Sequence, residues 1–313
     1  MSIVPPDKLF ATYSIVARDA ATGQLGMAVE THQMCVGSVV PWLLPGVGAL
    51  ATQSLVNISF GPIGLAMLRE GVPAPKVIEA LIASDAQAHV RQVAAVDAQG
   101  RVGAWTGERC IREASHRIGE GYSVQANMMT QNTVVPAMAQ AYEQTTGNLA
   151  ERMLAALQAA QREGGDIRGM QSAALKIVEG KQSGVRAWET IYDLRVDEHA
   201  DPPAELGRLV RLRSAQVLDA QGYETLKAGE RAAALETWRR AREMAPELEE
   251  TGFWQALTLA DEHSDVQTAA EIFNRVFKDD DRRAYWIDLI GRLQNCGSIE
   301  RSGAGDELIA ALS

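Results

Sequence analysis

A turn flanked by two runs of alternating residues lies near the start of the chain, in the segment 11–31, ATYSIVARDAATGQLGMAVET. Side chains such as Ile15 and Val29 recur at a period of two within these runs, which predicts two β-strands. The residues between them run from Asp19 to Gly23, and Asp and Gly both favour turns. We therefore expect a β-hairpin whose first strand opens on Thr12, and we expect the N-terminal part to be organised around it.

Further predicted strands and helices follow the hairpin in separate groups. Strands precede a pair of helices, further strands and a second pair of helices come next, and strands close the series. The predicted strands cover 38–44, 48–55, 92–96, 102–106, 116–125, 172–178 and 188–196, and the predicted helices cover 61–70, 74–83, 132–146 and 148–162. Segregated strands and helices are typical of an α+β domain in which helices cover sheets. We expect two antiparallel sheets packed face to face between two helical layers, a four-layer αββα sandwich over residues 12–197, after a leader of residues 1–11.

The pattern changes after Asp197. Asp201-Pro202-Pro203 predicts a linker, and only helical periodicity follows it, over residues 204–313. A period of 35 residues relates two helical segments: Ala234, Trp238 and Ala241 recur as Ala269, Phe273 and Val276. This spacing resembles the second half of a tetratricopeptide repeat, which implies a helical module with Trp238 and Phe273 buried between paired helices. A generic bundle of helical hairpins is the alternative.

Composition and charge exclude several classes of function. The chain has 313 residues, which suggests two domains, and its net charge of −10 argues against nucleic acid or anionic lipid as a partner. We expect no membrane span and a cytoplasmic location, because no long apolar stretch occurs and the three cysteines form no C-x-x-C pair. Phosphate-binding, dinucleotide and zinc-protease motifs are absent, and the five histidines lack metal-ligand spacing. No cofactor and no metal are expected.

Several motifs in fixed order resemble one known family. They are VGSVVPW at 36–42, GVGALATQS at 46–54, N-x-S-F-G-P-x-G at 57–64, RQVAAVDAQGRVGAWTG at 91–107, GEGYSVQANMM at 119–129 and GGDIRGMQSAA at 164–174. Together they resemble the domain of unknown function 1028 family, which is grouped with the N-terminal-nucleophile (Ntn) hydrolases, and the resemblance covers about 12–196. It implies the αββα fold, and it implies that Thr12, opening a strand, is a nucleophile whose own freed α-amine serves as base.

Such chemistry needs a hydroxyl, a neutral amine and donors for an oxyanion. Thr12 is the predicted catalytic residue, and Glu30 could orient its amine. Amide side chains could face a substrate, and a later polar group could anchor a carboxylate. The predicted substrate-binding residues are Glu30, Gln53, Asn57, Gln125, Asn127, Asp166, Arg168 and Gln171. A satisfied buried polar group is the alternative role for each of them.

Eleven residues precede Thr12. Either they are cut away, or translation begins later, or Thr12 stays internal and the amine base is absent. We therefore consider two functions. The first is hydrolysis of a small amide, such as a peptide, an acyl-amino acid or a ring amide. The second is a non-catalytic binding or scaffold protein, in which a degenerate Ntn-like domain accompanies a repeat module that recruits a partner. The sequence leaves open a protein or peptide partner for the C-terminal helices, and it leaves open a homo-oligomer.

Overall fold

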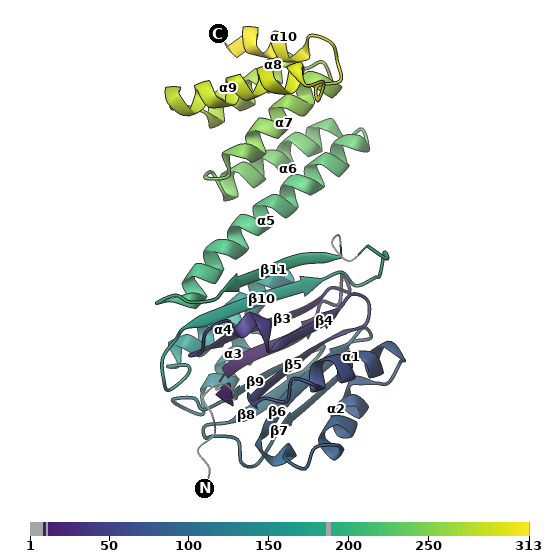
Figure 1. Cartoon of the computed structure of the whole chain (residues 1–313), viewed down its shortest axis with the longest axis vertical. Helices are drawn as coiled ribbons and strands as arrows, with labels where there is room; N and C mark the ends of the chain where they lie inside the picture. Colours follow the sequence, from purple (N-terminus) through teal and green to yellow (C-terminus); the bar gives the residue numbers. More distant parts are fainter. Residues whose placement is uncertain (1–8, 11, 186–188, 313) are drawn as a thin grey trace. The chain divides into compact units, whose positions relative to one another are not determined.

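The computed structural model describes residues 9–10, 12–185 and 189–312 of the chain (Figure 1). Backbone contacts divide the chain into two compact units, Met1–Val210 and Arg211–Ser313. Of the described residues, the first unit contains the strands, four complete α-helices and the beginning of a fifth, and the second unit is helical. The expected mixed α/β class, with antiparallel sheets followed by a helical region, is confirmed.

Two antiparallel sheets contain the strands of the first unit. One sheet has the order β1-β5-β6-β7, with β4 also paired to β5, and the other has the order β11-β10-β3-β2-β9-β8. The first comprises β1 (Leu9–Phe10), β4 (Pro41–Leu44), β5 (Gly48–Leu55), β6 (Arg91–Asp97) and β7 (Val102–Thr106). The second comprises β2 (Thr12–Arg18), β3 (Leu25–Thr31), β8 (Ser115–Gly119), β9 (Tyr122–Asn127), β10 (Ser172–Val178) and β11 (Thr190–Val196). The predicted hairpin is therefore the β2–β3 pair at the centre of the second sheet.

One face of each sheet contributes to a shared apolar core. Val16 and Val29 of the second sheet cluster with Ala51 and Ala94 of the first. Successive side chains of a strand point to opposite faces, so the alternate residues of β5 and β6 point away from this core. There, Leu50 and Val93 pack against helices, as described next. Alternation along β5 and β6 thus points successive side chains either to the core between the sheets or to the apolar layer under the helices.

Helices cover the outer face of each sheet (Figure 1). α1 (Phe60–Arg69) and α2 (Ala74–Ala83) pack on β5, β6 and β7, whereas α3 (Val134–Gln144) and α4 (Leu149–Arg162) pack on β2, β3 and β9. Asn148 and Glu151 form a capping box at the start of α4. The α4 helix lies so close to β3 that a Cβ added at Gly26 would fall 2.7 Å from the Met153 sulfur.

Three local predictions are wrong. The segment 116–125 forms two strands, β8 and β9, because Gly121 adopts a positive φ of 71° and turns the chain between them. Only Pro41–Leu44 of the segment 38–44 is a strand, since residues 36–38 form a single 3₁₀ turn. Pro202 begins a helix instead of a linker: proline fits the first helical turn, and the Asp201 carboxylate accepts a hydrogen bond from the Ala204 N–H at 3.1 Å.

The helices of the second unit follow α5 (Pro202–Lys227), within which the division between the units falls. They are α6 (Arg231–Met244), α7 (Glu249–Glu262), α8 (Val266–Val276), α9 (Asp280–Asn295) and α10 (Ala304–Leu312). Trp238 and Phe273 are fully buried in one apolar cluster, as expected. No helix among the described residues is long and apolar enough to cross a membrane.

Candidate functional site

Thr12 opens β2 and lies opposite Thr31 of β3 and Asn127 of β9. Alternation along β2 points Thr12 and Ser14 toward the other sheet, whereas Tyr13 points toward α4, where its hydroxyl donates to Gln161 Oε1 at 3.0 Å. The Thr12 side chain is fully buried, and its hydroxyl has no hydrogen-bond partner among the described residues. A buried hydroxyl without a partner is uncommon in a folded protein, so the position needs an explanation.

Side-chain amides surround Thr12 between the two sheets. Gln53 Nε2 lies 3.2 Å from the Thr12 carbonyl oxygen and 2.8 Å from Gln92 Oε1. Asn127 Nδ2 also donates to Gln92 Oε1, at 2.9 Å, and Gln92 Nε2 donates in turn to the Ala126 carbonyl. The structure therefore brings the predicted Gln53 and Asn127 together with Thr12.

Gln92 is a central member of this cluster that the sequence analysis missed. It shares the inward face of β6 with Ala94 and Val96, both of which belong to the apolar core between the sheets. A glutamine at an inward position of an otherwise apolar strand face was the available signal, because buried polar groups need partners and are seldom placed there without a reason.

Gln125 belongs to a second part of the same buried network. Its Nε2 donates to the Ser14 hydroxyl at 2.6 Å, and the Ser14 hydroxyl donates to Gln53 Oε1 at 2.6 Å. Ser123 donates to Gln125 Oε1 at 2.9 Å. Ser14 is therefore fully engaged, in contrast to Thr12 two residues earlier on the same face of β2.

Glu30 lies on the other face of the sheet from the Thr12 hydroxyl, because it pairs in register with Tyr13. It is fully buried, and neither carboxylate oxygen makes a hydrogen bond of normal geometry among the described residues. Burial raises the pKa of Glu30 well above its ordinary value; the Tyr13 hydroxyl opposes this rise, and the Asp166 charge adds to it. Glu30 is thus held toward its neutral form next to the start of β2.

Asp166 and Arg168 bind each other beside Glu30. Asp166 is buried and accepts hydrogen bonds from Arg168 Nε at 3.1 Å and Nη2 at 2.8 Å, and from the His32 N–H at 3.1 Å. Arg168 Nη2 also lies 3.5 Å from the hydroxyl of Thr31, the cross-strand neighbour of Thr12. The Gln171 N–H donates to the Thr31 carbonyl. These predicted residues therefore gather at the same end of β2 and β3 as Thr12.

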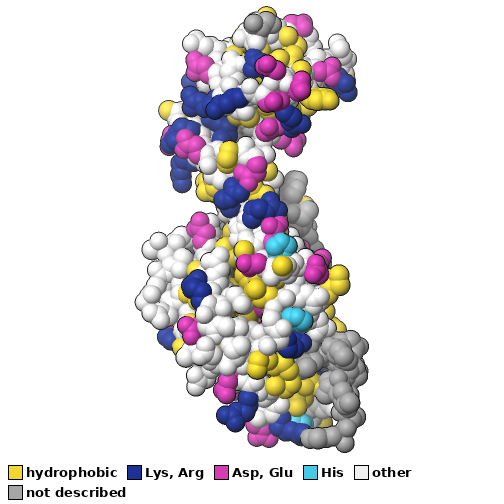
Figure 2. All heavy atoms as spheres, turned by 90° about the vertical axis from the view of Figure 1, so that its left-hand side faces the viewer, with side chains coloured by type: hydrophobic (Ala, Val, Ile, Leu, Met, Phe, Trp, Pro, Cys, Tyr) yellow, Lys and Arg dark blue, Asp and Glu magenta, His cyan; other side chains and the backbone are white. Residues whose placement is uncertain are grey.

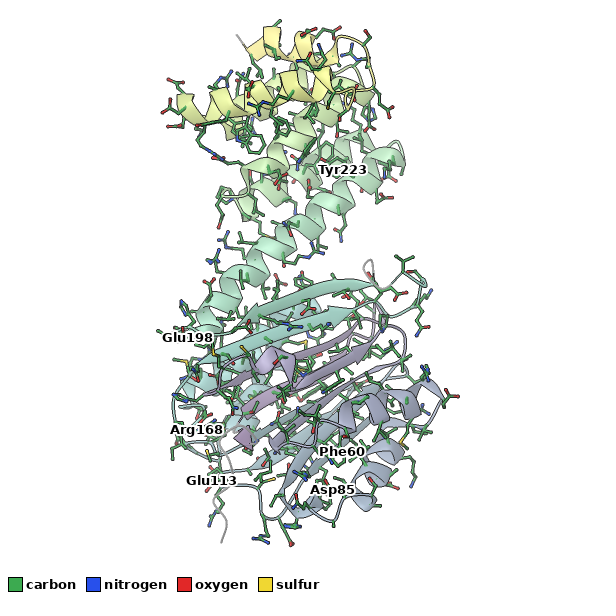
Figure 3. All side chains as sticks on the ribbon, viewed as in Figure 1. Phe60, Asp85, Glu113, Arg168, Glu198 and Tyr223 are labelled. Atoms are coloured by element: carbon green, nitrogen blue, oxygen red, sulfur yellow. The ribbon has the colours of Figure 1, made fainter. Side chains whose placement is uncertain are left out.

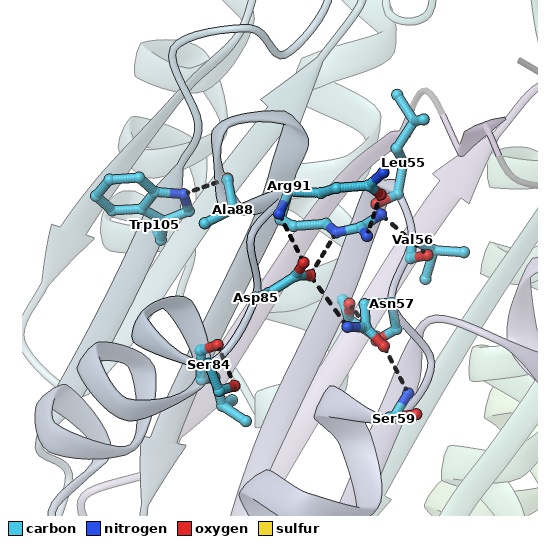
Figure 4. Close-up of polar contacts among 12 residues, drawn as sticks. Leu55, Val56, Asn57, Ser59, Ser84, Asp85, Ala88, Arg91 and Trp105 are labelled. Carbon is cyan, nitrogen blue, oxygen red and sulfur yellow. Dashed lines mark hydrogen bonds and ion pairs between the residues drawn. The ribbon is translucent and has the colours of Figure 1, made fainter. Parts of the chain in front are cut away.

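Asn57 belongs to a different cluster (Figure 4). Its Nδ2 donates to Asp85 Oδ2 at 3.1 Å, and the same carboxylate forms an ion pair with Arg91 at 2.8 Å. Arg91 also donates to the Leu55 carbonyl, so the cluster ties the end of β5 to the segment after α2. Asp85 and Arg168 lie well apart in Figure 3. Among the described residues, the Asn57 side chain bonds to Asp85 and to the Ser59 N–H and not to the amides around Thr12, and these contacts are those of a structural group.

The cluster around Thr12 is made of neutral amides and hydroxyls, which can donate hydrogen bonds to a carbonyl or an oxyanion. Among the residues that the structure describes, no three His, Cys, Asp or Glu side chains gather as metal ligands.

The first unit is thus an α+β domain in which helices cover two facing antiparallel sheets. A buried threonine begins a central strand of one sheet, among polar side chains between the sheets. Residues 12–206 match the model of a family described as "Family of unknown function (DUF1028)". Because the match spans more than half of the chain, the chain belongs to the DUF1028 family. The matched region begins at Thr12 itself.

A solved structure supports this assignment. The chain is similar to protein SPO2555 from Silicibacter pomeroyi, whose crystal structure is described with the same DUF1028 family. The two are 29% identical with a TM-score of 0.58, and the match covers 64% of this chain and 84% of that one. No curated protein matches the chain.

Proposed function

We propose that the first unit is an Ntn-type hydrolase of a small amide, in which Thr12 is the nucleophile once the residues before it are removed. The observation that carries this proposal is the buried Thr12 hydroxyl without a partner, at the residue where the family match begins. The Ser14 hydroxyl on the same face of β2 has two partners, as most buried hydroxyls that stabilise a fold do.

The order of layers supports the proposal. Helices α1 and α2, the sheet containing β5, the sheet containing β2, and helices α3 and α4 succeed one another, which is the αββα order of Ntn hydrolases. In such a domain the nucleophile opens a strand, so that its hydroxyl and its α-amine lie on one residue. An α-amine has an ordinary pKa of ~7.7–8.0 and is partly neutral near pH 7, so it can accept the hydroxyl proton without a histidine.

The amides around Thr12 supply the other requirement of the reaction. Attack on a carbonyl creates an oxyanion, and preorganised donors stabilise it. Asn127 and Gln53 present N–H groups that now bind Gln92 Oε1, and an incoming oxyanion would compete for them. Loss of one oxyanion donor typically costs ~2.7–4 kcal/mol of transition-state stabilisation.

The surroundings of Thr31 favour a substrate that carries a carboxylate. Arg168 is partly exposed and lies within reach of Thr31, beside the start of β2. A guanidinium beside Thr31, the cross-strand neighbour of the nucleophile, suits an acyl-amino acid or a short peptide better than an uncharged ring amide, if the substrate carboxylate shares Arg168 with Asp166.

A second candidate function is a non-catalytic binding or scaffold protein. One observation favours it: in the full chain Thr12 is completely buried, and its amide neighbours bind one another. In this proposal the helical unit is a tetratricopeptide-like module that recruits a partner. The recurrence of buried Ala234 and Trp238 as buried Ala269 and Phe273, on α6 and α8, supports that assignment.

The deciding experiment combines mass spectrometry of the native protein with turnover of acyl-amino acids and short peptides. We expect active protein to begin at Thr12, Thr12→Val to abolish turnover, and Thr12→Ser to retain part of it. Turnover by protein that keeps residues before Thr12 would contradict the amine-base mechanism. Absence of turnover in protein that begins at Thr12 would favour the binding function.

A further inference from the structure

The helical unit contains a hollow of about 300 Å³ beside the turn that joins α6 to α7. Four cationic side chains line it, Arg239, Arg242, Arg275 and Lys278, against one acidic side chain, Glu243. Figure 2 faces this side of the molecule, and Lys and Arg side chains gather there on the helical unit. In a chain whose net charge is −10, such a concentration of positive charge calls for a reason.

Two of the four cations have acidic neighbours in the protein. Arg239 forms ion pairs with both Glu236 and Glu243, and the charges of Asp219 and Glu243 act on Arg242. Arg275 and Lys278 make no hydrogen bond or ion pair among the residues that the structure describes. The hollow thus presents an excess of positive charge with donors available for an anion.

Arg242 is held in place by a buried amide. Its guanidinium donates to Gln255 Oε1, and Gln255 Nε2 donates to Asp219 Oδ1 at 2.6 Å. Gln255 is fully buried, so Arg242 is fixed by a relay that reaches back to α5. A fixed guanidinium loses less conformational freedom when it binds a ligand than a mobile one does.

Two of the cations repel each other. Burial lowers the pKa of Arg242 and the charge of Arg275 lowers it further, whereas the charges of Asp219 and Glu243 oppose this fall without cancelling it. Holding like charges close to one another in a half-buried hollow is unfavourable unless an anion joins them. The pair therefore suits a ligand that carries negative charge and can accept hydrogen bonds from both guanidinium groups.

The other walls of the hollow are apolar and include Leu248 and Val276. A second hollow shares Arg239, Arg242 and Arg275 but adds Glu236 and Glu271, so the anion belongs in the first. Phosphate would interact with the cationic side chains but would make no favourable contact with the apolar walls. A carboxylate next to an apolar side chain uses both, which favours a peptide as the ligand.

We propose that this hollow binds an acidic peptide segment of a partner, with a carboxylate bridging Arg242 and Arg275 and a neighbouring apolar side chain against Leu248 and Val276. The site is formed within the second unit and does not depend on the proposed hydrolase activity.

Fluorescence anisotropy with the full-length protein tests the proposal. The probe is a fluorescein-labelled short peptide of glutamates flanking a leucine, with the same peptide carrying glutamines as its uncharged counterpart. We expect Arg275→Gln to weaken binding of the acidic peptide roughly tenfold, equivalent to about 1.4 kcal/mol. Arg292→Gln is the matched control: it removes the same charge from an exposed position on α9 and should leave binding unchanged.

Thermal unfolding distinguishes a binding role from a structural one. Because Arg275 repels Arg242, Arg275→Gln should leave the Tm of the free protein unchanged or raise it. Equal binding of the glutamine peptide, or equal weakening by Arg292→Gln, would overturn the proposal. Full displacement of the peptide by inorganic phosphate at low concentration would also overturn it, since it would identify a phosphate site.

Discussion

Thr12 and Ser14 are two hydroxyls on one face of one strand, yet their surroundings differ. Ser14 accepts from Gln125 and donates to Gln53, whereas the Thr12 hydroxyl has no partner among the described residues. A buried hydroxyl that bonds to nothing costs free energy, and one that satisfies two amides saves it. The difference separates a hydroxyl that holds the fold together from one that is available for another task.

The first prediction compares these hydroxyls. Thr12→Val keeps the side-chain volume and removes a hydroxyl without a partner, so we expect the free energy of unfolding to stay the same or rise. Ser14→Ala removes the partner of the buried Gln53 Oε1 and Gln125 Nε2 atoms, and we expect it to lower the free energy of unfolding by ~1–3 kcal/mol. Urea unfolding measures both. A loss for Thr12→Val as large as that for Ser14→Ala would mean that the Thr12 hydroxyl has a structural partner.

The second prediction concerns Glu30. Burial raises its pKa in the folded state, so between its unfolded and folded pKa values the folded protein holds a proton that the unfolded chain has released. Below its ordinary pKa near 4.5, Glu30 is protonated in both states and does not change the free energy of unfolding. As the pH rises above that value, the free energy of unfolding falls. Each unit of pKa difference corresponds to ~1.4 kcal/mol.

Glu30→Gln should consequently flatten the dependence of stability on pH and gain stability relative to the native sequence between pH 5 and pH 8. Urea unfolding across this range measures the effect. Glu70→Gln, at an exposed position after α1, controls for the change in net charge and should leave the curve unaltered. If the free energy of unfolding changed with pH in the same way for Glu30→Gln and the native protein, the Glu30 carboxyl would have an ordinary pKa.

At the scale of the helix, close approach decides which glycines can be replaced. Gly222 on α5 lies against Trp238 of α6, and an added Cβ would fall 2.2 Å from a ring carbon. The Trp238 ring is fully buried, packs on Tyr223 and donates to the Asp219 carbonyl at 3.1 Å. Gly291 in α9 has no atom within 4 Å of its added Cβ. Close packing therefore excludes a side chain at Gly222, whereas Gly291 has space for one.

The third prediction uses this contrast. Gly291→Ala should stabilise the helical unit by ~0.5–1 kcal/mol, because alanine has the higher helix propensity. Gly222→Ala should destabilise it despite the same gain in propensity, since Trp238 must move, and overpacking typically costs ~1–3 kcal/mol. Far-UV circular dichroism during urea unfolding measures both. Stabilisation by Gly222→Ala would mean that α5 and α6 do not pack as described.

The fourth prediction tests the buried aromatic residue itself. Trp238→Ala should cost ~3–5 kcal/mol of stability, as expected for a large buried side chain. Trp254→Ala is the matched control, because Trp254 is 39% exposed and should cost much less. Equal losses would contradict the burial of Trp238 between helices.

At the scale of the molecule, the chain before Thr12 decides whether the first unit can act by the proposed mechanism. Leu9 and Phe10 form β1, which pairs with β5 at Leu55 and Ser54, in the sheet opposite the one that contains Thr12. Leu9 and Phe10 are therefore part of the first sheet. While the chain before Thr12 is present, the nitrogen of Thr12 is an amide and cannot act as a base.

The fifth prediction follows from this arrangement. A protease site placed so that cleavage leaves Thr12 as the first residue should produce activity that the uncut protein lacks. Because the neutral amine is the base, turnover should fall as the pH drops below ~7.7–8.0, the ordinary pKa of an α-amine. Initial rates from pH 5 to pH 9 measure the profile, with cut Thr12→Val protein as the control. Activity that is equal before and after cleavage would exclude the mechanism.

The sequence by itself determined the β2–β3 hairpin and the α2 and α4 helices, because periodicity and turn residues act over a few neighbours. The recurrence at 35 residues also predicted the burial of Trp238 and Phe273. The sequence also singled out Gln53, Asn127 and Arg168, which the fold gathers near Thr12. Only the tertiary structure decided the remaining features. Gln92 joins the Thr12 cluster, and Asn57 does not, because strands distant in the chain meet across the sandwich. Glu30 and the Thr12 hydroxyl point to opposite faces because register, set by the pairing of whole strands, assigns every side chain to a face.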